Sequence, residues 1–91
     1  MARFLITIPH EEDEVACARA VKILLETGSH YLTNAEFGCM DGDHRAWIIL
    51  DVDSKEEAMA VVPPVFRSQA TIVQLNRFSL EWIEEFLRHH S

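Results

Sequence analysis

The fold is decided by the stretch FGCMDGDHRAW, residues 37–47, because an Asp-Gly pair lies between two runs of strand-forming residues. Asp41 and Gly42 predict a two-residue type I′ hairpin turn, since both positions need positive φ and glycine adopts it without steric cost. In that register Cys39 faces His44, and a slip of one residue would reverse the faces. The stretch therefore predicts a hairpin that places a thiol beside an imidazole.

Strand and helix signals around this hairpin follow the order β-α-β-β-α-β, with one more helix at the end. Acidic residues 11–14 favour a helix start, and Gly28 is placed to end that helix. Ser54 and Ser79 are placed to cap the two later helices. We expect strands over about residues 3–8, 31–40, 44–52 and 70–78, with helices between them and after the last.

This order is the ferredoxin-like plan, an α+β fold in which two helices cover one face of a four-stranded antiparallel sheet. We expect one domain, residues 1–91. The strand over 44–52 is apolar on both faces, because Trp47 and Ile49 point away from Ile48 and Leu50. Two helices cover only one face, so we expect a homodimer, sheet against sheet, with the last helix completing the contact.

Composition narrows the possible partners. The chain has 15 acidic and 8 basic residues, a net charge of −7, which opposes binding to nucleic acid. Its apolar runs are too short for a membrane anchor or a signal peptide. Cys17 and Cys39 are too few for a disulfide scaffold. We therefore expect a cytoplasmic protein with reduced thiols and no membrane or nucleic-acid partner.

The chain resembles the dimeric α/β-barrel superfamily, in which two ferredoxin-like protomers close a barrel. Members include muconolactone isomerases, small antibiotic-biosynthesis monooxygenases and stress-responsive barrel proteins. Residues 38–47 (GCMDGDHRAW) followed by residues 62–67 (VPPVFR) are most similar to short bacterial barrel proteins of unassigned function. The resemblance implies a dimeric barrel, but no catalytic set of the enzymes matches this chain residue by residue.

His44 beside Cys39 is the candidate reactive pair. Imidazole carries protons near neutral pH and activates a neighbouring thiol, so His44 is the candidate acid/base. The alternative is structural: His44 forms a hydrogen bond near the turn, and Cys39 fills a small apolar site.

Three further side chains are candidate ligand contacts, together with Cys39. Trp47 lines an apolar pocket or packs in the dimer. Arg67 clamps a carboxylate or forms a salt bridge. Asn76 faces the barrel interior or lies on an exposed face.

The sequence predicts no metal and no cofactor. Asp41 and Asp43 add ligand types to Cys39 and His44, but their spacing matches no zinc or EF-hand site. His10 and His30, at strand ends, are balanced between a role in the site and surface placement. The remaining histidines, His89 and His90, are expected to complement a helix C-terminus.

Two functions of different class follow, and the sequence does not decide whether the protein is an enzyme. The first is binding of a small hydrophobic or anionic molecule in a sheet-lined pocket. The second is a cofactor-free isomerase or monooxygenase that acts on a small organic acid. A non-catalytic oligomeric interaction module is the third alternative.

Overall fold

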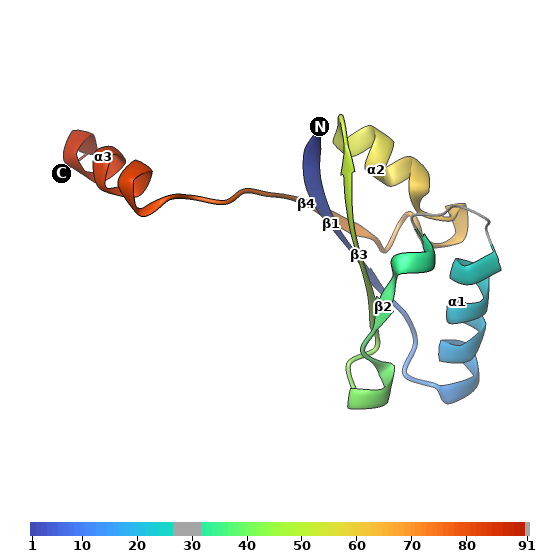
Figure 1. Ribbon diagram of the computed structural model, residues 1–91. Helices are drawn as coiled ribbons and strands as arrows, with labels where there is room; N and C mark the ends of the chain where they lie inside the picture. Colours follow the sequence, from blue (N-terminus) through green and yellow to red (C-terminus); the bar gives the residue numbers. More distant parts are fainter. Residues whose placement is uncertain (27–31, 91) are drawn as a thin grey trace.

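The computed structural model describes residues 1–26 and 32–90, which form an antiparallel sheet of four strands with helices α1 and α2 on one side (Figure 1). The strand order is β2-β3-β1-β4. The α+β class is as predicted. None of the described helices has the length and apolar composition needed to cross a membrane. The elements are β1 (Ala2–Pro9), α1 (Glu14–Glu26), β2 (Glu36–Phe37), β3 (Arg45–Val52), α2 (Lys55–Val61), β4 (Thr71–Leu75) and α3 (Leu80–His90), with short 3₁₀ turns η1 (Leu32–Asn34), η2 (Cys39–Asp41) and η3 (Pro64–Phe66).

The core lies between the sheet and the two helices. Alternate residues of β1 and β3 point to the helices, so that Ile6 lies opposite Ile48 and both are fully buried. From α1, Leu24 packs into the same core. The other face of the sheet is open, and Ile49 on β3 is 57% exposed there. The prediction that β3 is apolar on both faces is confirmed.

Side-chain caps define the helix starts, as predicted for α2 and α3. The Ser54 hydroxyl accepts a hydrogen bond from the Glu57 amide at 3.1 Å. The Glu57 carboxylate reaches back to the Asp53 amide at 3.0 Å, one residue earlier than a standard capping box. Ser79 accepts a hydrogen bond from the Trp82 amide at 3.0 Å. These local signals are readable in sequence because each cap bonds within its own turn.

The hairpin differs from its prediction. β2 has only two residues, and its register with β3 is the expected one, Phe37 opposite Ala46. The predicted type I′ turn is wrong. It requires positive φ at both Asp41 and Gly42. Gly42 has φ 84°, but Asp41 does not have positive φ, since no described residue other than glycine does. Instead Cys39 begins η2, where the Gly42 amide donates to its carbonyl at 3.0 Å. Cys39 is therefore not strand-paired with His44. The 3₁₀ turn bonds its own amides and ends the ladder early.

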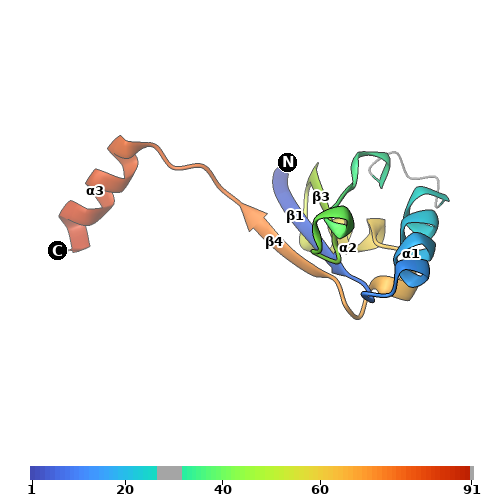
Figure 2. The same ribbon diagram turned by 90° about the horizontal axis from the view of Figure 1, so that it is seen from below.

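Two other expected boundaries shift. β4 ends at Leu75 rather than near residue 78, because the chain leaves the sheet there as an extended segment. Gly28, His30 and Tyr31, which carry the expected end of α1 and start of β2, lie outside the described residues. The segment after β4, residues 76–90, includes α3. It stands away from the body on the side opposite α1 and α2 (Figures 1 and 2). We call it the arm.

Candidate metal centre

Two histidines and two cysteines from separate segments converge at one corner of the body. His10 follows β1, Cys17 lies in the first turns of α1, Cys39 opens η2, and His44 immediately precedes β3. Each offers one donor atom, and the four donor atoms lie within 4.8 Å of one another. We call these four residues the Cys₂His₂ cluster. They are half-buried or buried, so water is partly excluded from the space between them.

The backbone holds the cluster in place from both sides. The His10 amide donates to the His44 carbonyl at 3.0 Å, which extends the pairing of β1 and β3 by one step. Asp13 begins α1: its side chain accepts from the Ala16 amide at 2.9 Å, and its carbonyl accepts from the Cys17 amide at 2.8 Å. This cap turns Cys17 back toward the end of β1.

Within the cluster, His10 is the common partner of both thiols. Its Nε2 lies 3.1 Å from the Cys17 sulfur and 2.9 Å from the Cys39 sulfur. The His10 and His44 rings meet edge to face, with centroids 5.9 Å apart. Donor atoms around a tetrahedral zinc ion are separated by about 3.3–3.8 Å. A metal would therefore require side-chain shifts of about 1 Å or less, with the sulfurs moving slightly away from His10.

Proton affinities in the cluster are shifted in opposite directions. The hydrogen bond with Cys39, followed by burial, raises the pKa of the Cys17 thiol to about 11. Burial, followed by repulsion from His44, lowers the pKa of His10. At neutral pH His10 is therefore a neutral imidazole with a lone pair to offer, and Cys17 holds its proton until something displaces it.

One ring nitrogen of each histidine bears on metal binding. His44 Nδ1 is buried and has no hydrogen-bond partner among the described residues. Such an orphaned polar atom costs about 1–3 kcal/mol. The His10 ring donates to the Ile8 carbonyl, and because Nε2 faces the sulfurs, this bond fits an Nδ1–H donor. Metal-binding histidines are commonly oriented by a backbone carbonyl in this way.

The turn that carries Cys39 depends on two glycines for different reasons. A Cβ on Gly38 would lie 2.7 Å from the Asp43 carbonyl oxygen and 2.8 Å from the Trp47 ring. Gly42 has φ 84°, with open space around it. Gly38 therefore allows the turn that carries Cys39 to lie close against the start of β3, because a side chain at this position would collide with Asp43 and Trp47.

The predicted site residues divide into two groups. Cys39 and His44 both belong to the cluster, although not as the cross-strand pair that the sequence predicted. Trp47 lies on the open face, where it lines a groove with Leu5 and Ile49 and is covered by the Arg45 guanidinium at 5.1 Å. His44 is not among the residues that line this groove.

Arg67 and Asn76 lie away from the cluster. Arg67 donates from Nε to the Val62 carbonyl at 2.8 Å and from Nη2 to the Ala60 carbonyl at 3.4 Å, and so it satisfies the C-terminal end of α2. Asn76 lines a groove at the far end of the open face with Arg3 and Arg77.

Sequence reasoning missed Cys17 as a site residue and left His10 undecided. Asp41 and Asp43, which it weighed as ligands, are not members of the cluster, and Asp43 instead pairs with Arg45 at 2.5 Å. That pairing, mainly its hydrogen bond, lowers the pKa of Asp43. The signal that points to His10 is the register of β1 and β3, which puts the residue after Pro9 beside the residue before Arg45.

Comparison with known proteins adds no assignment: no family model, no curated protein and no solved structure matches this chain. The function is therefore argued from the cluster itself.

Proposed function

We propose that this protein binds one transition-metal ion, zinc by preference, through His10, Cys17, Cys39 and His44. The observation that carries the proposal is the convergence of four donor atoms to within 4.8 Å, from four segments of the chain. The cluster takes in both cysteines of the chain and two of its five histidines.

The donor set favours zinc over other ions. Two sulfurs and two ring nitrogens in a tetrahedral arrangement suit a borderline-soft ion with no geometric demand of its own. Magnesium and calcium prefer six or more oxygen ligands, and the cluster offers none. The orphaned Nδ1 of His44 supports the same conclusion, because a bound metal would satisfy that lone pair.

Four protein ligands leave no open position, so the proposed site is structural rather than hydrolytic. A bound ion would fasten the start of α1 to the end of β1 and to the turn before β3. Because binding to the folded state alone adds to folding free energy, the bound ion would stabilise this small domain. The proposed role is therefore a metal-stabilised domain, folded most tightly when zinc is bound.

The test is metal content with matched variants. Purified full-length protein exposed to zinc and then dialysed should retain one zinc per chain by elemental analysis. Cobalt(II) should give the visible bands of a tetrahedral ion and the near-ultraviolet charge-transfer band of thiolate ligands. Cys39→Ser should lose about half of the charge-transfer intensity, because Cys17 remains as a thiolate ligand, and should weaken binding by about 100-fold or more. His10→Ala should weaken binding similarly.

The control for the histidine variant is His89→Ala on the arm, which removes an exposed imidazole outside the cluster and should leave binding unchanged. Circular dichroism of each variant separates loss of ligand from loss of fold. Zinc binding that survives in Cys39→Ser, or that is lost equally in His89→Ala, would contradict the proposal.

We also propose the ferredoxin-like plan and, with it, membership of the dimeric α/β-barrel superfamily. The antiparallel order β2-β3-β1-β4, with α1 and α2 on one face, supports this plan. An open apolar face supports a homodimer in which that face is covered either by the partner's sheet, as the barrel requires, or by another element of the partner. A crystal structure would test both, and a monomer with a solvent-covered open face would contradict the barrel.

Small-molecule binding is the second candidate, favoured by a groove beside the cluster. Its volume is about 460 Å³, within the range of ligand sites, and His10, Ala20, Ile23, Phe66 and Arg19 contribute to its walls. The walls also include Glu11 and Gln69, so a small hydrophobic acid would fit with its carboxylate beside Arg19 and its apolar part against Ile23 and Phe66. Thermal-shift screening of such acids on wild-type and Arg19→Ala protein tests this idea, and equal responses would count against it.

A further inference from the structure

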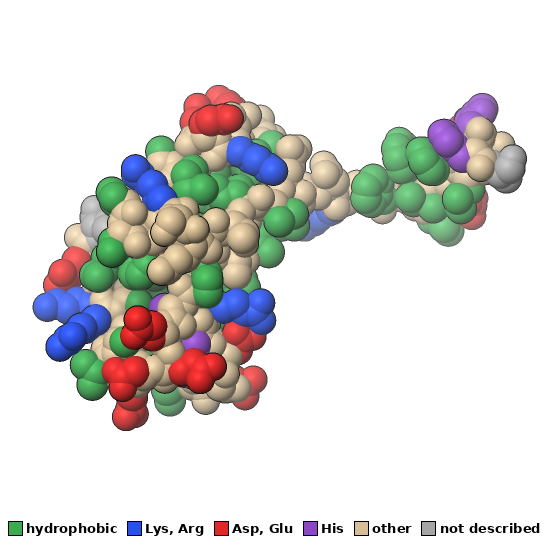
Figure 3. Space-filling model, turned by 180° about the vertical axis from the view of Figure 1, so that it is seen from behind, with side chains coloured by type: hydrophobic (Ala, Val, Ile, Leu, Met, Phe, Trp, Pro, Cys, Tyr) green, Lys and Arg blue, Asp and Glu red, His purple; other side chains and the backbone are tan. Residues whose placement is uncertain are grey.

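The arm leaves a large apolar surface uncovered within one chain. α3 has eleven residues, all of them described, and none is buried. Phe78, Trp82, Phe86 and His90 stack in sequence along one side, with ring centroids 5.1, 5.5 and 4.1 Å apart. Figure 3 shows hydrophobic side chains gathered along the arm, clear of the body.

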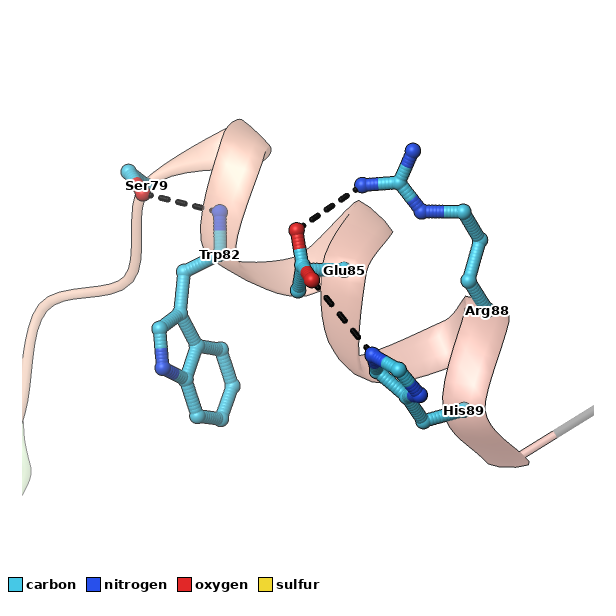
Figure 4. A network of polar contacts seen from close by, with 5 residues as sticks. All are labelled: Ser79, Trp82, Glu85, Arg88 and His89. Carbon is cyan, nitrogen blue, oxygen red and sulfur yellow. Dashed lines mark hydrogen bonds and ion pairs between the residues drawn. The ribbon is translucent and has the colours of Figure 1, made fainter.

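The opposite side of α3 is polar and bonded to itself. Glu85 accepts hydrogen bonds from Arg88 at 3.0 Å and from His89 at 3.4 Å, and Ser79 caps the first turn (Figure 4). These contacts identify the polar side of α3, the side that we expect to face water. An amphipathic helix of eleven residues is nevertheless marginal by itself in water, so its apolar side requires a partner surface.

The body carries a matching uncovered surface, which is the open face of the sheet. Strand pairing places Leu5, Ile49 and Val73 side by side on that face. Ile49 and Val73 are 57% and 51% exposed. The arm extends on this side of the sheet (Figures 1 and 2). Helix and face are thus both apolar, both uncovered and present once per chain.

Overall dimensions show how much surface is at stake. The radius of gyration is 16.3 Å, against about 12 Å for a compact chain of this length. The accessible surface is 6610 Å², about 1,200 Å² more than a compact monomer of this mass exposes. A standard interface buries about 800 Å² per partner, so the excess matches one interface.

We infer that two copies of this chain exchange arms, each α3 packing its aromatic side on the open sheet face of its partner. Charge adds little to this seating, because Arg3 on the open face is already paired with Asp51 at 3.5 Å, so the seating depends on the apolar surfaces of α3 and of the sheet. Reciprocal exchange is two-fold symmetric and closes at a dimer. The inference uses residues outside the Cys₂His₂ cluster and stands or falls independently of the metal.

The first test is mass by light scattering at micromolar concentration, with zinc and with chelator. Wild type should have twice the 10.5 kDa chain mass in both. Trp82→Ala with Phe86→Ala should weaken the dimer at least about 30-fold. The matched control, Glu81→Ala with Glu84→Ala, removes two carboxylates of the same helix that are not part of the stack of rings. The dimer of this control should be weakened far less. A monomeric wild type, or equal dissociation of both double variants, would overturn the inference.

The second test separates exchange from simple sheet stacking. Trp82→Glu damages the arm and Ile49→Glu damages the face, so each alone should be monomeric. An equal mixture should form heterodimers by native mass spectrometry, because one intact arm meets one intact face. Circular dichroism and zinc content show that each variant is folded. Absence of heterodimer from two folded monomers would overturn arm exchange, as would a wild-type assembly that grows beyond a dimer.

Discussion

The Cys₂His₂ cluster and the arm differ in where their side chains find contacts. At the corner, separate segments of the chain bring polar groups into contact, and His10 contacts both thiols. Along the arm, the rings of Phe78, Trp82 and Phe86 contact one another within a short stretch of chain. The corner is therefore completed by folding of one chain, whereas the arm requires a surface from another. Stability of the first should depend on metal, and stability of the second on protein concentration.

The largest expected effect is metal-linked stability at the corner. Free zinc at 100 times its dissociation constant stabilises the fold by about 2.7 kcal/mol, which corresponds to a rise in Tm of about 10 °C or more for a small domain. Differential scanning calorimetry with zinc and with chelator measures this shift. In Cys39→Ser the shift should disappear, and a shift of equal size in that variant would show that zinc acts elsewhere.

Raising the protein concentration should move Trp82 of the arm from water into the dimer interface. In a Trp47→Phe background, Trp82 is the remaining tryptophan. Its fluorescence should shift to the blue at concentrations where the dimer forms, since the indole leaves water for the partner's sheet. Dilution should reverse the shift. An emission maximum that does not change across the dimer transition would place Trp82 outside the interface.

The pH dependence of zinc affinity follows from the proton on Cys17. Its pKa of about 11 means that zinc displaces this proton at any pH below that value, so affinity rises as pH rises and falls as pH falls. The expected change is about tenfold per pH unit for each proton displaced. The lowered pKa of His10 delays its competition until below pH 6.5. Competition titrations at several pH values measure the slope, and a flat profile would exclude thiolate ligation.

The smallest predicted effects are at the two glycines of the turn. Gly38→Ala should cost about 1–3 kcal/mol and weaken zinc binding, because the added methyl meets the Asp43 carbonyl and the Trp47 ring next to Cys39. Gly42→Ala should cost about 1 kcal/mol from its positive φ and spare the metal. Urea unfolding measures the free energy of unfolding of the two variants, and Gly38→Ala should lose more of it than Gly42→Ala. The reverse order would mean that the close approach at Gly38 is easily relaxed.

Much of the fold was predictable because its signals are local. Ser54 and Ser79 cap helices within a single turn, and the alternation in β3 separates two faces. The Asp-Gly pair correctly located a left-handed residue at Gly42. It could not reveal the 3₁₀ turn, which depends on Gly38 passing close to Trp47, a contact across the ladder.

Sequence reasoning singled out Cys39 and His44, two of the four cluster residues, because they lie five residues apart on either side of one turn. His10 joins them only through the register of β1 with β3, and Cys17 only through the angle at which α1 leaves that strand. Such contacts depend on tertiary packing, which residue spacing does not encode. Sequence reasoning also weighed Asp41 and Asp43 as ligand types that match no known spacing, and in the structure Asp43 pairs with Arg45 instead.

X-ray absorption at the zinc edge tests the central claim most directly, because it counts the atoms around the ion in full-length protein. The account predicts two sulfur neighbours at about 2.3 Å and two nitrogen neighbours at about 2.0–2.1 Å, with the imidazole scattering of two histidines. A first shell of nitrogen and oxygen alone, without sulfur, would contradict a metal centre built from His10, Cys17, Cys39 and His44.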